Sequence, residues 1–173
     1  TPKSLEMTGE IANGWMPIFF AIDRMEESFK SLNNGLIKSN RTIKDIAVSA
    51  QIATYVTDDI DTAFNEERKH IAFYVGGMGT FYHEHMHRIG FGNEADKIRE
   101  AYINKDRDKA AQLVTNEMVN ATAIIGSPKD CSIQMEKFFS SGVDEIRLVL
   151  NVPDSDSFKS AITQLAPYIK GEK

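Results

Sequence analysis

The sequence predicts an α/β protein whose strands form a parallel sheet, as part of a (β/α)8 barrel, the TIM barrel fold. Apolar runs of strand length alternate with amphipathic helical segments along the chain, which is the pattern of right-handed βαβ units. Only three strands are predicted, and so small a sheet leaves two exposed edges unless further strands close it. The chain also opens directly on a helix start. We therefore expect the 173 residues to come from a longer barrel.

The first part of the chain is predicted to alternate helix, strand, helix and strand. Residues 2–12 have apolar side chains at helical spacing, with Thr1 as the N-cap and Pro2 at the first helical position. A short apolar run at 14–20 has strand length, and residues 23–38 predict an amphipathic helix. Residues 43–56 are rich in β-branched side chains, and both alternating faces are apolar. We expect that strand to be buried on both sides, as in a parallel sheet covered by helices.

The second part is dominated by one long helical segment. From residue 58 to about residue 125 the pattern is almost wholly helical, interrupted by glycines. Ser127 as the cap and Pro128 at the first helical position then predict a new helix that ends near residue 142. The last strand is predicted at 143–150 and a closing helix at 154–170. We treat residues 1–173 as a single domain.

The composition restricts the class of function. With 42% hydrophobic residues, the chain can bury one sizeable core but is too short for two full domains. A net charge of −5 argues against binding to nucleic acid. No apolar run approaches the roughly 18–20 residues that cross a bilayer, and the single Cys131 cannot form an internal disulfide. We therefore expect a cytoplasmic protein with neither a membrane nor a nucleic acid as its partner.

One short motif points to a different chemistry. The segment "HEHMH" reads as H-E-x-x-H, with His83 and His87 one helical turn apart and Glu84 between them. In zinc peptidases two such histidines hold the metal, and the glutamate is the general base. A zinc peptidase is therefore an alternative function of another class.

The surroundings of this motif argue against the peptidase. The longer zinc-peptidase signature has a third histidine where this chain has Asn93, and Glu94 or Glu100 is only a weak substitute among many acidic residues. Short motifs of this kind also arise by chance. Strands alternating with helices do not surround a peptidase zinc helix. We therefore expect no metal site, and we interpret the three histidines at 83, 85 and 87 as a polar helix face.

Several longer stretches together resemble the luciferase-like monooxygenase superfamily. The resemblance is closest to its coenzyme F420-dependent branch, the deazaflavin-dependent oxidoreductases that include methylenetetrahydromethanopterin reductase. It runs nearly from end to end of the chain and rests on the order and spacing of four stretches: "TPKSLEMTGEIANGWMP", "VTDDIDTAFNEERKHIAFYVGGMGTFYHEHMHRIGF", "AYINKDRDKAAQLVTNEMV" and "IIGSPKDCSIQMEKFFSSGVDEIRLVL".

This resemblance implies that the chain is the C-terminal part of the barrel. The chain would start in the loop after the fifth barrel strand and contain strands six, seven and eight. The helical segment at 58–125 would be the insertion of the family before the last strand. Several active-site residues would lie in an N-terminal portion outside these 173 residues.

The resemblance also implies a cofactor and candidate site residues. The cofactor would be coenzyme F420, with FMN, the cofactor of the monooxygenases of this fold, as the alternative. Thr1, Pro2 and Lys3 stand where the family commonly has Gly-Pro-Lys, at a helix start that faces the phosphate-bearing tail of the cofactor. Orphan N–H groups and the helix dipole favour phosphate there. Thr1 replaces the commoner glycine.

The substrate pocket is expected near residues 74–82, "YVGGMGTFY". Met78, Phe81 and Tyr82 are the candidates to line it, although the same side chains suit packing between helices. The resemblance implies hydride transfer between the coenzyme and a small organic substrate, in an enzyme that forms a homo-oligomer, a dimer, at full length. No residue of this chain is assigned a catalytic role, and the chain alone is expected to be incomplete and inactive.

Overall fold

A four-stranded parallel sheet forms the centre of the molecule, which a computed structural model describes over residues 1–169. Its strands are β1 (Gly14–Trp15), β2 (Ala47–Val56), β3 (Ala123–Gly126) and β4 (Glu145–Leu150). β2 pairs with all three others, and every pairing is parallel. Because residues 53 and 54 of β2 pair with both β3 and β4, these two strands lie on opposite edges of β2. The α/β class with a parallel sheet is thus confirmed.

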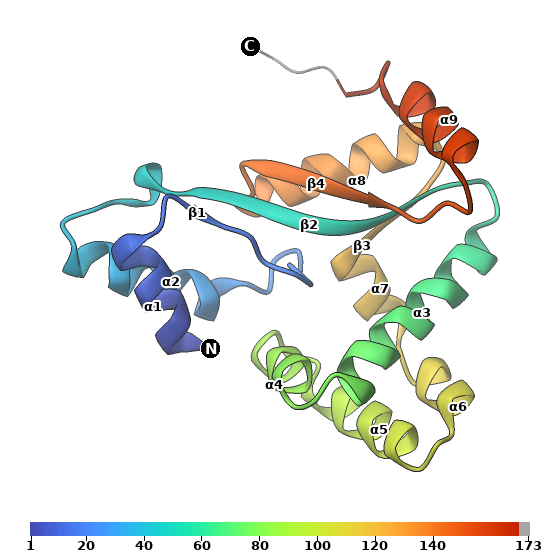
Figure 1. Cartoon of the computed structure of the whole chain (residues 1–173), viewed down its shortest axis with the longest axis horizontal. Coiled ribbons are helices and arrows are strands. Elements are labelled where there is room, and N and C mark those ends of the chain that lie inside the picture. Colours follow the sequence, from blue (N-terminus) through green and yellow to red (C-terminus); the bar gives the residue numbers. More distant parts are fainter. Residues whose placement is uncertain (170–173) are drawn as a thin grey trace.

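The helices form groups around this sheet (Figure 1). α1 and α2 lie together at one end of β2, α3 and α5 to α7 gather near the other end, α4 lies between these two groups, and α8 and α9 follow β3 and β4. None of the helices in residues 1–169 is both long and apolar enough to span a bilayer. The bounds are α1 (Pro2–Ile11), α2 (Glu26–Lys38), α3 (Ile60–Gly77), α4 (Phe81–Arg88), α5 (Gly92–Ile103), α6 (Arg107–Gln112), α7 (Asn116–Thr122), α8 (Pro128–Ser140) and α9 (Ser155–Leu165).

All three predicted strands are shorter than expected, the last because β4 begins at Glu145 and not at residue 143. The run at 14–20 is a strand only over Gly14–Trp15, followed by a single bridge between Ile18 and Gln51. Pro17 interrupts this run, since proline has no N–H to donate to a ladder. The predicted strand at 43–56 begins at residue 47, because Ile43–Asp45 form a 3-10 turn instead.

One strand was missed within the predicted helical segment at 58–125. The last helix there ends at Thr122, and residues 123–126 form β3, whose side chains are all buried. A short apolar run such as Ala-Ile-Ile-Gly fits a buried strand and a buried helix equally well. This run forms a strand because it pairs with β2. The closing helix ends at Leu165, and residue 170 of its predicted range lies outside the described residues.

The two faces of the sheet differ in burial, which corrects the expectation that β2 is buried on both sides. Val48, Ala50 and Ile52 point into the main core, with exposed fractions of 1%, 0% and 0%. Residues 47 and 51 between them are exposed, and 49 and 53 are only partly buried. β4 alternates in the same way, with Glu145, Arg147 and Val149 outward. We call this second side, over residues 47–53, the open face; nearer the end of the strand, Tyr55 on the same side is buried against Glu67 of α3.

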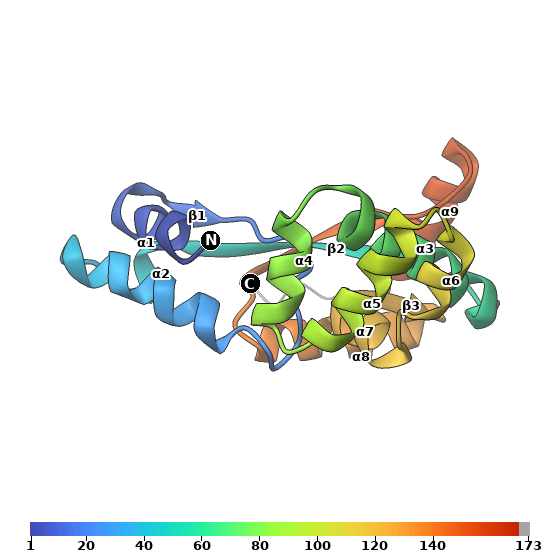
Figure 2. The same cartoon turned by 90° about the horizontal axis from the view of Figure 1, so that it is seen from below.

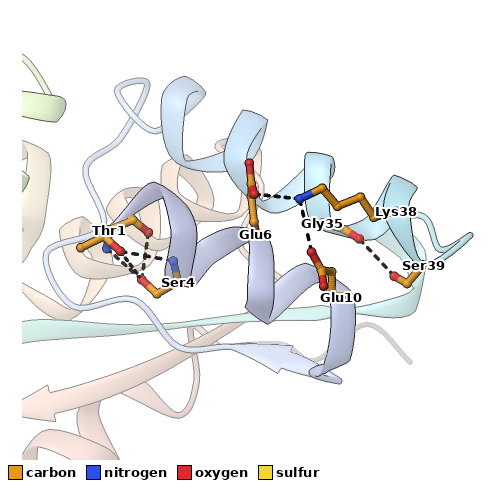
Figure 3. Close-up of polar contacts among 7 residues, drawn as sticks. All are labelled: Thr1, Ser4, Glu6, Glu10, Gly35, Lys38 and Ser39. Atoms are coloured by element: carbon orange, nitrogen blue, oxygen red, sulfur yellow. Dashed lines mark hydrogen bonds and ion pairs between the residues drawn. The ribbon is translucent and has the colours of Figure 1, made fainter.

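The contact between α1 and α2 is a close crossing of two backbones. A Cβ added at Gly9 would lie 2.2 Å from the Leu32 carbonyl oxygen, and one at Gly35 would lie 1.8 Å from that of Glu6. Only glycine leaves room for this approach. On the solvent side the Lys38 ammonium lies 2.9 Å from Glu6 and 3.4 Å from Glu10 (Figure 3).

A side chain completes the hydrogen bonding of β3. The Gln134 amide of α8 donates to the Ile125 carbonyl at 2.8 Å, and its oxygen accepts from the Ile125 N–H at 3.0 Å. Both bonds of one residue in a parallel ladder are therefore satisfied by a single side chain instead of a further strand.

Candidate functional site

The start of α1 borders a small cleft that also receives α4. Thr1 caps the helix, because its side-chain oxygen accepts from the Ser4 N–H at 3.2 Å. Both views place this end of α1 toward α4 (Figures 1 and 2). The cleft has a volume of about 200 Å³, and we call it the N-terminal cleft. Its lining residues are Thr1, Ser4, Leu5, Thr8, Trp15, Met16, Pro17, Ile18, Ser28, Phe81, His85 and Arg88.

α4 contributes one face to this cleft. Phe81, His85 and Arg88 follow one another at intervals of four and three residues, so they lie on the same side of the helix. The His85 imidazole is partly buried, and its Nε2 lies 3.0 Å from the Phe19 carbonyl oxygen. Removal from water lowers the pKa of His85. A neutral imidazole with Nε2–H donating to that carbonyl follows from both observations.

The polar groups of the N-terminal cleft suit an anion. The positive end of the α1 dipole and the Arg88 guanidinium border the same space. Glu84 lies 4.0 Å from Arg88 and is more exposed, with 57% of its side chain accessible against 19% for Arg88. A guanidinium on an apolar wall can bind a carboxylate or phosphate through paired hydrogen bonds.

The structure brings together two of the six predicted site residues. Thr1 and Phe81 both line the N-terminal cleft, whereas Pro2 occupies the first position of α1 and Lys3 is exposed outside the lining. Tyr82 instead packs edge-on against Tyr74 and Phe19, with ring centroids 4.8 and 5.9 Å away.

Met78 is the sixth of these residues. It ends α3 with 46% of its surface exposed, and it does not border the N-terminal cleft.

A larger cleft lies at the carboxyl ends of β2 and β4. It has a volume of about 740 Å³ and is bordered by the residues that follow these strands and by one side of α3. We call it the strand-end cleft. In parallel α/β folds, ligands bind at this end of the strands. The lining residues are Tyr55, Val56, Thr57, Asp59, Thr62, Ala63, Glu66, Lys69, His70, Phe73, Asn151, Val152 and Pro153.

A buried carboxylate links two side chains of the strand-end cleft. Glu67 is fully buried; its Oε2 accepts from the Tyr55 hydroxyl at 3.0 Å, and its Oε1 lies 3.1 Å from His70 Nδ1. Burial, and then the Glu67 charge, raise the pKa of Tyr55 far above its usual value. Tyr55 therefore stays a hydrogen-bond donor. An imidazole that a carboxylate orients through Nδ1 can accept or donate a proton at Nε2.

Sequence reasoning missed this group. A signal was present, since Glu67 lies four residues from Ala63 and four from Ile71, both buried on the core face of α3. A charged side chain on an apolar helix face is rarely buried without a partner.

The histidines of the H-E-x-x-H motif have separate contacts. His83 Nε2 and His87 Nε2 lie 2.8 and 2.9 Å from the same oxygen, Oδ1 of Asp96 in α5. His85 points to the Phe19 carbonyl on another side of α4. The three histidines are thus not one uniform polar face.

Comparisons with known proteins identify the family. The model of the luciferase-like monooxygenase family matches residues 1–145. A putative coenzyme F420-dependent oxidoreductase of Mycobacterium tuberculosis is 28% identical over 149 residues, which cover 82% of this chain and 43% of that protein. The 5,10-methylenetetrahydromethanopterin reductase of Methanolobus tindarius is 28% identical over 171 residues, covering 98% of this chain and 51% of the relative. The chain thus spans about half the length of these relatives.

A solved structure agrees with both the family and the fold. The coenzyme F420-dependent tetrahydromethanopterin reductase of Methanopyrus kandleri superposes with a TM-score of 0.76 at 25% sequence identity. The match covers 98% of this chain and 49% of that one. The resemblance inferred from the sequence and the TIM-barrel class are therefore confirmed.

Proposed function

The chain belongs to the luciferase-like monooxygenase family, and we propose that it forms part of a coenzyme F420-dependent oxidoreductase. The reaction is hydride transfer between the coenzyme and a small organic substrate. The names of the relatives support this choice, since they are F420-dependent enzymes or methylenetetrahydromethanopterin reductases.

The observation that carries the proposal is the convergence of Thr1 and Phe81 on the N-terminal cleft. One was expected to contact the cofactor and the other the substrate, and they lie 80 residues apart in sequence. Arg88 adds a cation that the sequence did not single out. A volume of about 200 Å³ suits a phosphate-bearing part of the coenzyme, not the whole molecule.

The coenzyme, when bound, supplies the hydride-carrying deazaflavin ring. The residues of this chain would bind and orient it: Arg88 and the positive end of the α1 dipole would hold the anionic part, and Phe81 would provide an apolar wall. The strand-end cleft is the second candidate position for the organic substrate. Its volume favours this use, and His70 can hold a proton at Nε2 there.

The proposal is tested by titrating the purified protein with oxidised coenzyme F420 and following the fluorescence of the coenzyme. Arg88→Gln is expected to weaken binding about tenfold, the effect of losing one charged hydrogen bond. Lys97→Gln is the matched control, because it removes an exposed cation of α5 that does not line the cleft, and little change is expected. Binding of FMN without binding of F420 would instead favour the FMN-dependent monooxygenase. Equal loss in both variants would contradict the placement at the N-terminal cleft.

A further inference from the structure

Three potential metal-binding atoms meet where α4 packs against α5. His83 Nε2 and His87 Nε2 both point at Asp96 Oδ1, and the three atoms lie within 4.8 Å of one another. The imidazole centroids are 4.8 Å apart. Two imidazole nitrogens and one carboxylate oxygen are donor types found together in zinc sites that keep a position open for water.

The backbone fixes this arrangement. Residues four apart lie on one face of a helix, so α4 places the two histidines side by side. The chain then turns through Gly90, whose φ of +84° favours glycine, and starts α5 at Gly92. Both views show α5 running beside α4 (Figures 1 and 2).

Gly92 also makes room for one of the ligands. A Cβ at this position would lie 2.5 Å from His87 Nδ1, so the imidazole rests directly against the glycine. The helices themselves are held by a buried layer beneath the polar cluster, so the frame does not depend on the cluster. The fully buried or nearly buried members of that layer are Met86, Ile89, Phe91, Ala95 and Ile98.

The spacing of the atoms is close to what a metal requires. With bonds of 2.0–2.1 Å, tetrahedral geometry puts neighbouring ligand atoms about 3.3 Å apart. The nitrogen-to-oxygen distances here are 2.8 and 2.9 Å. Each nitrogen-to-oxygen distance would therefore lengthen by about half an ångström, and the two nitrogens, which lie within 4.8 Å of each other, would come to about the same 3.3 Å. The Asp96 and His87 side chains are 58% and 45% exposed and can rotate to make this adjustment.

We propose that His83 Nε2, His87 Nε2 and Asp96 Oδ1 bind a divalent transition-metal ion of the zinc type, which ties α4 to α5. Imidazole nitrogens favour this class over magnesium or calcium, which take oxygen ligands. Water completes the coordination, because the cluster opens to a surface hollow of about 370 Å³. Arg99 and Glu100 border that hollow with opposite charges, so Asp96 sets its net negative charge.

This site differs from a zinc peptidase site and from the expectation that the histidines bind no metal. The third ligand is Asp96, thirteen residues after His83, and not Asn93 or Glu94. Glu84, the general base of the peptidase motif, is not part of the cluster and lies near Arg88. The proposed role is to stabilise the junction of α4 and α5, and it is independent of the proposed oxidoreductase function.

The test is a metal titration of tag-free, chelator-treated protein. Calorimetry with Zn²⁺ is expected to give one site per chain, and Co²⁺ is expected to produce the visible absorption bands of a low-coordinate site. Zn²⁺ should also raise the melting temperature. His83→Gln, His87→Gln and Asp96→Asn should each weaken binding at least about tenfold, since even the loss of an outer-shell partner costs that much. Circular dichroism checks that these variants fold.

Two control variants separate the proposal from its competitors. Glu84→Gln removes the glutamate of the peptidase motif, and Glu94→Gln removes an exposed carboxylate at the start of α5; both should bind Zn²⁺ like the unmodified protein. Absence of binding at millimolar Zn²⁺ would overturn the proposal. So would a site whose affinity is unchanged in Asp96→Asn, or one that Glu84→Gln weakens.

Discussion

α1 and α2 meet through their backbones, whereas the contact of α4 and α5 carries a cluster of polar side chains. Gly9 and Gly35 leave no space for a side chain between the first pair. In the second pair, His83 and His87 share one oxygen of Asp96 in partly exposed positions. Backbone atoms at a helix crossing cannot move apart without shifting a whole helix, whereas exposed side chains can rotate and exchange hydrogen-bond partners. The first contact is therefore suited to fixing geometry, and the second to binding a ligand.

The largest expected effect is that of a methyl group in the α1–α2 crossing. Gly35→Ala should lower the free energy of unfolding by about 2 kcal/mol or more, because overpacking costs about 3 kcal/mol and the gain in helix propensity returns only about 1. The clash is with the Glu6 carbonyl, which cannot rotate away. Chemical denaturation measures it. Gly14→Ala is the control, since its Cβ would meet Ala47 oxygen only at 3.5 Å; an equal loss there would contradict a steric crossing.

The second effect should appear in the pH dependence of stability. Burial lowers the pKa of His85 below its unperturbed value of 6.5. In the unfolded chain this imidazole takes up a proton more readily, so stability is expected to fall as the pH drops below about 6.5. Urea unfolding at a series of pH values measures the free energy of unfolding. Below about pH 6.5 it should fall less steeply with decreasing pH in His85→Gln than in the unmodified protein.

Asp96 contributes in a separate pH range. Hydrogen bonds from His87 and then His83 lower the pKa of its carboxyl, so its stabilising effect is lost only as the pH falls below the usual value of 3.8. If the free energy of unfolding of His85→Gln and of the unmodified protein depended equally on pH near pH 6, His85 would not be the titrating group.

A methyl group at the α4–α5 junction sharpens the contrast. Gly92→Ala should change the free energy of unfolding by less than about 1 kcal/mol, because the atom in its way belongs to the partly exposed His87 imidazole, which can rotate. The same variant should weaken Zn²⁺ binding, since the displaced imidazole no longer meets Asp96. If Gly92→Ala lowered the free energy of unfolding as much as Gly35→Ala, the α4–α5 contact would also be a tight backbone contact with no room for a methyl group.

The smallest effect is expected for the ion pairs over the α1–α2 crossing. Lys38→Met removes the contacts with Glu6 and Glu10, all three being exposed or partly so. Exposed ion pairs contribute little, so thermal unfolding should not differ measurably from that of the unmodified protein. A clear loss that disappears at high salt would show that charge, and not backbone fit, holds the two helices together.

Features determined by neighbouring residues were predictable from the sequence. The caps at Thr1 and Ser127, the alternation of helices and strands, and the parallel sheet all follow from local signals, and the structure confirms them. Features that depend on distant contacts were not predictable. β3 exists because it pairs with β2, and the exposure of residues 47 and 51 on the open face follows from how the helices pack around the sheet.

The candidate site likewise combines residues that the sequence could indicate with contacts that only the fold reveals. Thr1 and Phe81 were selected from a resemblance, yet only the fold reveals that they share a cleft with Arg88. Asp96 could not be singled out among many acidic residues, because its relation to His83 depends on the turn between α4 and α5.

The amide of Gln134 determines at which edge the sheet can pair with a further strand. It occupies both hydrogen-bonding groups of Ile125, so a strand approaching β3 would first have to displace it. Within residues 1–169, β4 pairs only with β2 and has no comparable blockade. A further strand, from any source, would therefore add beside β4, where Glu145 and Arg147 would select its charge pattern. Within the described residues, the Gln134 side chain on α8 thus blocks pairing at the β3 edge and leaves the β4 edge open to a further strand.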